Sequence, residues 1–389
     1  MAGLGKGDRA KSHAGLVRDF KQPPRFGNPL LSLTYALAIA LIVVATGAGP
    51  PHSAHAAAHK ASSASAAPEV VAPTKAAAKA GPKPKPLKPK PDTRSLQVID
   101  TARSAEGVTL HFKLAKGPFP CPGKPYTDDT TIVFIPKHFR ATGTIDMLVH
   151  FHGHHGLIAQ KMLDHDLREQ VYESGRNIVL VMPQGPQNAT DSSGGKLEGR
   201  GAFQRFLDEV LAVLKSQAAT TALASSALGK KAKLGAMAIS SHSGGYKVTA
   251  KILNDGGYPV REIYLFDSLY GELDAYLDWL SAKVRGRKLI SWYVIDTPAR
   301  LNKALMGKLR KAGVKVLHEP VEGSLTKWQL MNGRAIFIHT DIQHGRTPYK
   351  HHNMRDALFA SAFRRSTGAP QSDWYKLLKV PRPIVERKP

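Results

Sequence analysis

The stretch Leu234–Val248 reads LGAMAISSHSGGYKV, and it decides the fold. An apolar run leads into residues 241–245 (SHSGG), and an amphipathic stretch follows. This order predicts a buried strand, a tight turn and a helix. A nucleophilic serine on such a turn needs small residues two positions before and after it, because larger side chains clash where the chain reverses. Ser241 and Gly245 occupy those positions around Ser243, which is therefore the candidate nucleophile.

Apolar runs alternate with amphipathic stretches along the chain from about Ser95. The apolar runs predict strands, and the stretches at residues 159–175 and 203–217 predict helices. Strands are expected at residues 108–114, 130–139, 145–153, 177–185, 234–240, 261–271, 288–298 and 334–345. Alternating strands and helices indicate an α/β fold with a mainly parallel sheet covered by helices on both faces. In such sheets the functional groups collect beyond the carboxyl ends of the strands.

The chain resembles the α/β-hydrolase superfamily over most of residues 105–370. The resemblance rests on the serine turn, on the strand end HFHGHHG at residues 150–156, and on later aspartates and histidines in the order Ser, Asp, His. The usual turn is G-x-S-x-G, and here Ser241 replaces the first glycine. The resemblance implies a serine hydrolase that cleaves an ester, amide or peptide bond through an acyl-enzyme and needs no cofactor.

Two backbone regions are candidates for stabilising a developing oxyanion. The amide of Gly244 lies beside Ser243 at the start of the predicted helix, where backbone N–H groups favour negative charge. By the resemblance, the strand end before the first helix supplies a second amide, near Gly153 and His154.

The resemblance also implies an acid and a base after the nucleophile. Asp267 and Asp296 both follow apolar strands. The superfamily's usual position favours Asp296, but this residue also fits the start of a helix that contains an early proline, so we favour Asp267. His344 and His352 both follow the last predicted strand, and the shorter connection favours His344. The base would take the serine proton, and the aspartate would hold the imidazole in the required tautomer.

A metal site is the alternative use of the histidines in LVHFHGHHG, residues 148–156. On a strand His150, His152 and His154 would face one side, and imidazole is a good zinc ligand. Residues 164–166 (DHD) could add ligands. A catalytic zinc site usually gathers its ligands from several elements, so we expect no metal here. We also expect the backbone of this stretch to matter more than its imidazoles.

The N-terminal quarter has a different composition from the rest of the chain. Residues 1–29 form a basic tail, and residues 30–48 are uncharged and about long enough to cross a bilayer as a helix. A small-x-small pattern at residues 54–56 fits a signal-peptide cleavage site, so the apolar segment is interpreted as a signal peptide or a membrane anchor. Residues 49–95 are an Ala/Lys/Pro-rich linker, predicted to be disordered, and residues 96–389 form the predicted hydrolase-like domain.

The net charge indicates which classes of molecule the protein binds, and the cysteine content indicates whether it has a disulfide. The net charge is +25, and residues 1–95 hold 14 Lys/Arg against 4 Asp/Glu. Together with the apolar segment, this predicts a protein of the periplasm or cell envelope that acts on a small-molecule or peptide-like substrate and contacts anionic envelope polymer through its linker. Export would separate it from nucleic acid. The single cysteine, Cys121, excludes an internal disulfide. A non-catalytic envelope-binding protein is the alternative, but such a protein has no need of a nucleophile turn.

Overall fold

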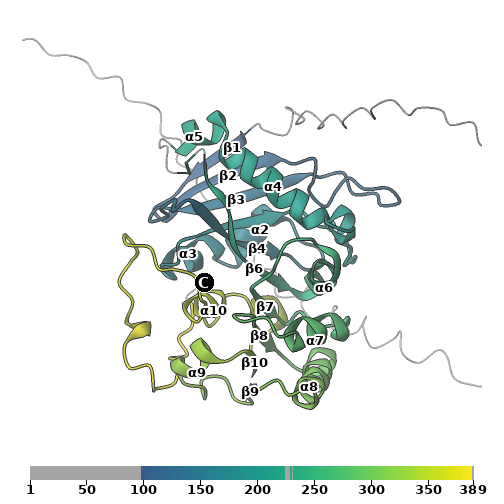
Figure 1. Cartoon of the computed structure of the whole chain (residues 1–389), viewed down its shortest axis with the longest axis vertical. Helices are drawn as coiled ribbons and strands as arrows, with labels where there is room; N and C mark the ends of the chain where they lie inside the picture. The colour runs from purple at the N-terminus through teal and green to yellow at the C-terminus, as the bar shows by residue number, and fades with distance from the viewer. Residues whose placement is uncertain (1–97, 224–227, 230, 388–389) are drawn as a thin grey trace, which may run out of the picture. The chain divides into compact units, whose positions relative to one another are not determined.

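The alternation of apolar and amphipathic stretches produces a sheet with helices on both faces (Figure 1). The structure, a computed structural model, describes residues 98–223, 228–229 and 231–387. The predicted basic tail, membrane or signal segment and Ala/Lys/Pro linker lie outside the described residues. Within the described part of the chain, no helix is both long enough and apolar enough to span a bilayer.

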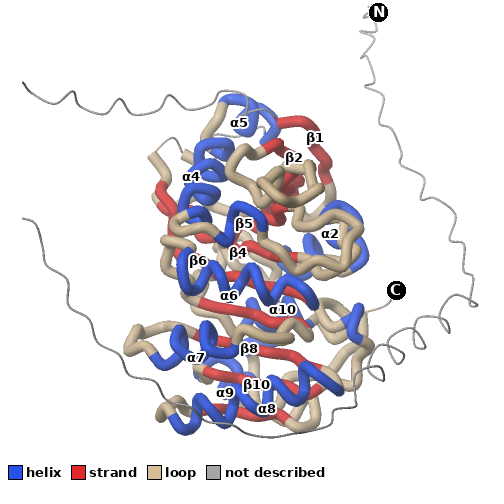
Figure 2. Tube along the Cα trace, turned by 90° about the vertical axis from the view of Figure 1, so that its right-hand side faces the viewer, coloured by secondary structure: helices blue, strands red, loops and turns tan. Residues whose placement is uncertain are grey.

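The described strands form one mixed, mainly parallel sheet in the order β1-β2-β3-β5-β4-β6-β7-β8-β10-β9. The pairs β1–β2, β2–β3 and β3–β5 are antiparallel, and the pairs from β5 to β9 are parallel. Figure 2 shows these strands lying side by side between helices. The strands are β1 (Val98–Arg103), β2 (Gly107–Lys113), β3 (Thr130–Pro136), β4 (Thr144–Phe151), β5 (Ile178–Pro183), β6 (Lys233–His242), β7 (Glu262–Phe266), β8 (Lys288–Tyr293), β9 (Val316–Glu319) and β10 (Ala335–His339).

The degree of burial explains why some strands could be predicted from the sequence and others could not. Every residue of β5, β7 and β8 is buried, as expected for parallel strands covered on both faces. The predicted runs correspond to β2 to β8 and β10. The prediction missed β1 and β9, which are the two edge strands. β1 is mostly exposed and β9 has only four residues, so neither carries a long apolar run.

Two hydrophobic clusters lie on opposite faces of the sheet. Successive residues of β3 show the division, because Val133 belongs to one cluster and Phe134 to the other. Helices α4, α6, α7 and α8 pack on the first cluster, and α2, α3, α9 and α10 contribute to the second (Figure 1). Their bounds are α2 (Ile158–Asp164), α3 (Leu167–Glu173), α4 (Ala202–Leu214), α6 (Tyr246–Asp255), α7 (Leu273–Ser281), α8 (Asp296–Lys311), α9 (Lys327–Asn332) and α10 (Asn353–Phe359). The remaining elements are α5 (Gln217–Leu223), η3 (Gly195–Glu198), η4 (Ser243–Gly245), η5 (His344–Arg346) and η6 (Asp373–Tyr375).

One predicted helix is divided in the structure. Residues 159–175 were expected to form a single helix, and they form α2 and α3 with a break at His165 and Asp166. His165 is buried and stacks on Tyr349 with ring centroids 5.8 Å apart. Asp166 adopts a left-handed backbone with φ 46°, which aspartate tolerates better than most residues. The chain therefore bends where a histidine is buried in the interior.

The fold class predicted from the sequence is confirmed in the described residues. The strand order places the carboxyl ends of β4, β6, β7, β8 and β10 at the same edge of the sheet, because these neighbours run parallel. Loops that are far apart in the sequence meet at this edge.

Candidate active site

The candidate nucleophile lies on a sharp turn between β6 and α6. Strand β6 runs directly into η4, whose first residue is Ser243, and α6 follows without an intervening loop. Ser243 has φ 52°, a left-handed backbone that is uncommon outside glycine. This strained conformation is typical of a serine held exposed at the top of a strand-to-helix turn.

Close packing requires glycine at two positions around Ser243. A Cβ atom at Gly153 would lie 2.5 Å from the Ser243 Cβ and 3.1 Å from its Oγ. A Cβ atom at Gly245 would lie 2.8 Å from the Phe151 carbonyl oxygen and 2.9 Å from the Ser241 Cβ. The end of β4 therefore packs directly against the turn: a side chain at Gly153 would displace Ser243, and one at Gly245 would clash with Phe151 and Ser241.

Ser241, which departs from the usual glycine, has a bonding role. Its Oγ lies 2.8 Å from the Ser268 Oγ, and the Ser268 hydroxyl donates to the Ser243 carbonyl oxygen at 2.8 Å. The extra hydroxyl thus links the turn to the loop after β7. Sequence reasoning treated Ser241 only as a small residue, and it did not identify Ser268.

Ser243, His344 and Asp267 form a hydrogen-bonded chain. The His344 Nε2 lies 2.9 Å from the Ser243 Oγ, and the His344 Nδ1 lies 2.5 Å from the Asp267 Oδ2. With Nδ1–H donating to the carboxylate, Nε2 is free to accept the serine hydroxyl proton. The structure therefore brings together the two residues favoured from the sequence, one from the loop after β7 and one from the loop after β10.

Asp267 is fully buried and its carboxylate is oriented by several groups. Its Oδ1 accepts from the Val294 backbone N–H at 2.9 Å, and the Tyr270 hydroxyl donates to its Oδ2 at 3.4 Å. Burial, and then the negative charge of Asp267, raise the pKa of Tyr270, so this tyrosine remains a donor. The backbone of Asp267 is left-handed, with φ 46°.

The two alternative residues lie elsewhere. Asp296 is exposed and is the first residue of α8, with φ 61°. Within the described chain, no hydrogen bond joins it to a histidine. His352 precedes α10, and its Nδ1 lies 2.8 Å from an Arg387 guanidinium nitrogen and 3.6 Å from a Glu173 carboxylate oxygen. The structure therefore does not bring Asp296 or His352 to Ser243.

The backbone candidates for an oxyanion site do surround Ser243. Gly153 contacts it as described, and Gly244 follows it in the first turn of a helix, where amides have no intrahelical acceptor. Among the hydrogen bonds of the described residues, none has the amide of Gly153 or His154 as its donor. The amides of Gly153 and His154 thus have no acceptor among the described residues.

The four histidines of residues 150–155 lie in different environments and contact different partners. His150 is buried and its Nδ1 lies 2.8 Å from the Ser240 Oγ. The His152 Nδ1–H donates to the Gly153 carbonyl oxygen at 2.6 Å, and its Nε2 accepts from the Gly185 amide at 2.9 Å. His154 and His155 are exposed, and the His154 Nε2 lies 2.9 Å from the Ser192 Oγ.

No metal cluster forms around these imidazoles in the residues that the structure describes: no three His, Cys, Asp or Glu side chains are placed to hold an ion. The two aspartates of residues 164–166 have other partners, because Asp164 binds Lys161 and Asp166 binds Arg387. His165 lies near His150 and His152 in the interior without forming a metal cluster with them in the described residues.

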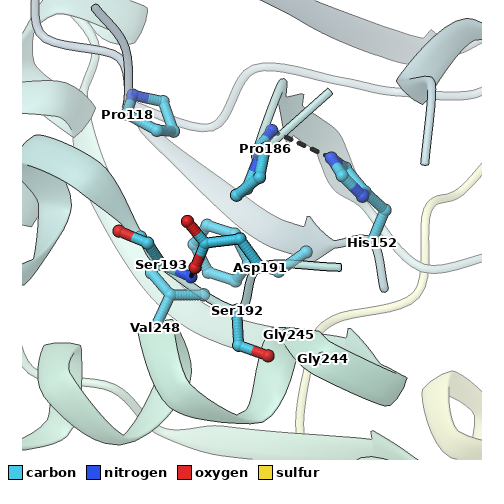
Figure 3. A pocket seen from close by; sticks show the side chains of 12 residues that line it. Pro118, His152, Pro186, Asp191, Ser192, Ser193, Gly244, Gly245 and Val248 are labelled. Carbon is cyan, nitrogen blue, oxygen red and sulfur yellow. Dashed lines mark hydrogen bonds between the residues drawn. The ribbon is translucent and has the colours of Figure 1, made fainter. Parts of the chain in front are cut away.

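A narrow recess lies beside the turn (Figure 3). Its cavity volume is only about 20 Å³, and glycines 244 and 245 form part of its wall. Figure 3 shows His152 and Pro186 on one side and Asp191, Ser192 and Ser193 near the turn. The serines come from the loop after β5, whose Ser/Gly-rich sequence was not recognised as part of the site. Ser243 and His344 do not line this recess, whose volume is sufficient for about one water molecule.

Buried histidines underlie the site, and burial is the main reason for their low pKa values. Burial lowers the pKa of His152 and of His165 to about 4. It also lowers the pKa of His150 and His242 well below the usual value. His242, which sequence reasoning did not single out, donates from Nε2 to the His344 carbonyl oxygen at 3.0 Å, and the two rings lie 4.9 Å apart.

No protein-family model matches this sequence, and neither does any curated protein. The solved structures that it resembles include an S-formylglutathione hydrolase from Agrobacterium tumefaciens, with 10% identity over 68% of this chain and 95% of that one and a TM-score of 0.40. A feruloyl esterase module from Clostridium thermocellum has 12% identity over 73% of this chain and 96% of that one, with a TM-score of 0.38. A fluorophosphonate-binding serine hydrolase from Staphylococcus aureus has 14% identity over 65% of this chain and 97% of that one, with a TM-score of 0.39. At this identity and overlap the neighbours do not define the chemistry of this chain, which follows from its own side chains.

The buried histidines predict a loss of stability in mild acid. Between pH 6.5 and about 4 the unfolded chain binds protons at His152 and His165 and the folded chain does not, so the free energy of unfolding falls as the pH falls through this window. The lowered pKa values of His150 and His242 act in the same direction. His152 and His165 each contribute a loss of roughly 1 to 2 kcal/mol between pH 6.5 and 5. Urea unfolding at pH 7, 6 and 5 measures the effect. Equal stability at these three values would contradict it.

Proposed function

We propose that this chain, which has the α/β-hydrolase fold, is a serine hydrolase that cleaves an ester, amide or peptide bond through an acyl-enzyme. The observation that carries the proposal is the hydrogen-bonded chain from Ser243 through His344 to the buried Asp267. A left-handed serine, a histidine bonded to it and a buried carboxylate on the far side of the imidazole form the arrangement that activates a hydroxyl nucleophile.

The acylation step follows from this arrangement. The His344 Nε2 takes the hydroxyl proton of Ser243 as the Oγ forms a bond to the substrate carbonyl carbon. The carbonyl π electrons move to oxygen, which becomes an oxyanion facing the amides of Gly244 and of Gly153 or His154. When the oxyanion collapses, the bond to the leaving group breaks, and the His344 Nε2–H gives its proton to the departing alkoxide or amine.

Deacylation repeats the sequence with water. A water molecule gives a proton to the His344 Nε2 while its oxygen attacks the acyl carbon, and the Ser243 Oγ leaves with that proton as the acid is released. Asp267 keeps the imidazole oriented and stabilises the imidazolium that forms in both steps. Its two further donors, the Val294 amide and the Tyr270 hydroxyl, keep the carboxylate in place.

The proposal extends to location and partners on sequence grounds. The apolar segment 30–48 and the small-x-small pattern after it support export to, or anchoring in, the cell envelope. The substrate would be a small-molecule or peptide-like acyl compound. The Lys/Pro-rich linker would contact an anionic envelope polymer.

The nucleophile is tested with a fluorophosphonate probe, which reacts with an activated serine. The full-length protein is expected to be labelled, and Ser243→Ala to lose the label and its activity on p-nitrophenyl acetate, because the Oγ is absent. Circular dichroism checks that the variant is folded. Undiminished labelling or ester cleavage by Ser243→Ala would contradict the proposal. Loss of wild-type activity after chelation would point instead to a metal-dependent reaction.

The acid is tested by comparing two aspartates. Asp267→Asn is expected to lower kcat by about 10⁴-fold, because an amide presents the wrong hydrogen-bonding group to the His344 Nδ1. Asp296→Asn is the matched control and is expected to change kcat less than threefold, because its side chain is exposed at the start of α8. Steady-state kinetics on the same ester decides between them, and a larger loss from Asp296→Asn would reverse the assignment.

The packing of β4 against the turn is tested at Gly153. Gly153→Ala is expected to lower kcat by at least about 100-fold, because its Cβ would displace the Ser243 side chain, and misplacement of about 1 Å is costly. Gly307→Ala is the control, since its Cβ would meet nothing within 4 Å in α8. Activity of Gly153→Ala within threefold of wild type would show that the turn tolerates a side chain there.

A further inference from the structure

We propose that Glu322, held by Arg382 from the C-terminal segment, is a positioning residue that fixes the loop carrying His344. The inference rests on the proposed function, because it assigns His344 the role of the base. The loop in question, residues 341–350, is called the base loop below. Glu322 touches neither Ser243 nor His344, and it acts only through the ends of this loop.

Both ends of the base loop meet at one carboxylate oxygen. Thr340 lies directly after β10, and its hydroxyl donates to the Glu322 Oε2 at 2.5 Å. His351 follows the loop, and its Nδ1 lies 2.8 Å from the same oxygen. A single side chain from the segment after β9 therefore sets the spacing between the start and the end of the loop.

Arg382 completes this arrangement from the other side. It is fully buried, and its guanidinium donates to the Glu322 Oε1 at 2.5 Å and to the Asp356 Oδ2 at 3.2 Å. Asp356 lies in α10, which follows the base loop. The Glu322 side chain is only 7% exposed, so an unpaired charge at either residue would be costly.

The charge state of Glu322 suits its role. Burial alone would raise the pKa of Glu322, but the hydrogen bond from His351 and the positive charge of Arg382 outweigh it and lower the pKa to about 2. The ionised carboxylate only accepts hydrogen bonds, and the groups around it are donors: Thr340, His351 and Arg382.

A second arginine of the C-terminal segment secures the end of the loop. The Arg387 backbone N–H donates to the Lys350 carbonyl oxygen at 2.8 Å. Its guanidinium donates to Asp166 at 3.0 Å and to Glu173 at 2.9 Å and 3.1 Å. The C-terminal segment is thus connected both to the loop and to α3.

His344 needs this external support. Its side chain is 41% exposed, so close packing does not hold it on all sides. Its ring contacts Ser243, Asp267 and, at 3.5 Å, the Tyr270 hydroxyl, and its carbonyl oxygen accepts from His242 and from the Thr347 hydroxyl. If the ends of the loop moved apart, the imidazole would shift relative to both partners. A shift of about 1 Å is enough to lower the rate about 100-fold.

The first test compares two buried glutamates on the same segment. Glu322→Gln keeps the side-chain volume but removes the charge and one acceptor oxygen. It is expected to lower kcat on p-nitrophenyl acetate at least tenfold and to change KM less than twofold. Glu319→Gln is the matched control, because Glu319 is also buried but accepts from the Leu325 amide and does not contact the base loop. Equal kcat values for the two variants would overturn the proposal.

A double-mutant cycle separates positioning from general damage. In a His344→Ala background, Glu322→Gln is expected to cause no further loss of the residual activity, because there is no base left to position. The same fold-loss in both backgrounds would overturn the proposal. If Glu322→Gln does not fold, Thr340→Val removes one donor to the same oxygen and is expected to lower kcat three- to tenfold, again without changing KM.

Hydrogen–deuterium exchange provides a readout that does not depend on activity. Glu322→Gln is expected to increase exchange at least tenfold in residues 341–350, while β6 and α6 keep wild-type protection. If Glu322→Gln increases exchange in the base loop but the wild-type protein shows no Ser243-dependent fluorophosphonate labelling, Glu322 anchors the loop and the proposed function is rejected. Unchanged exchange in the base loop would reject the positioning role even if Ser243 is the nucleophile.

Discussion

The contact between the end of β4 and the turn after β6 is the constraint on which the site depends. Ser243 has a left-handed backbone, Gly153 packs directly against its side chain, and Ser268, bonded to Ser241, donates to its carbonyl oxygen. The same contact brings the amides of the β4 strand end beside the serine. One packing interaction thus sets both the nucleophile and the amides proposed to stabilise the oxyanion.

The proposed acid comes from the strand next to the serine strand, and its surroundings explain why it suits that place. Asp267 follows β7 with a left-handed backbone, as Ser243 does after β6. Its side chain is buried, and donors from β8's end and from Tyr270 fix the carboxylate toward His344. Asp296, one strand further on, begins a helix at the surface, and no hydrogen bond among the described residues joins its carboxylate to a histidine.

The histidines show how one residue type serves different purposes in one fold. His150, His152, His165 and His242 are buried and kept neutral by burial. They provide hydrogen bonds under the strand ends without adding charge next to the proposed imidazolium of His344. The C-terminal segment adds ion pairs, because Arg382 binds Glu322 beside the base loop and Arg387 binds Asp166 and Glu173.

The sequence by itself determined the strands of the sheet interior, the fold class and the serine turn, because these depend on residues close together along the chain. A run of apolar residues makes a buried strand, and small residues two positions from Ser243 permit its turn. The sequence favoured Asp267 and His344 but left each with a rival. They lie 77 residues apart, and His344 lies 101 residues from Ser243, so only the parallel order of the strands decided which side chains meet. The break at His165 and the separate surroundings of the four histidines were also decided by tertiary packing, because burial against distant residues leaves no local pattern.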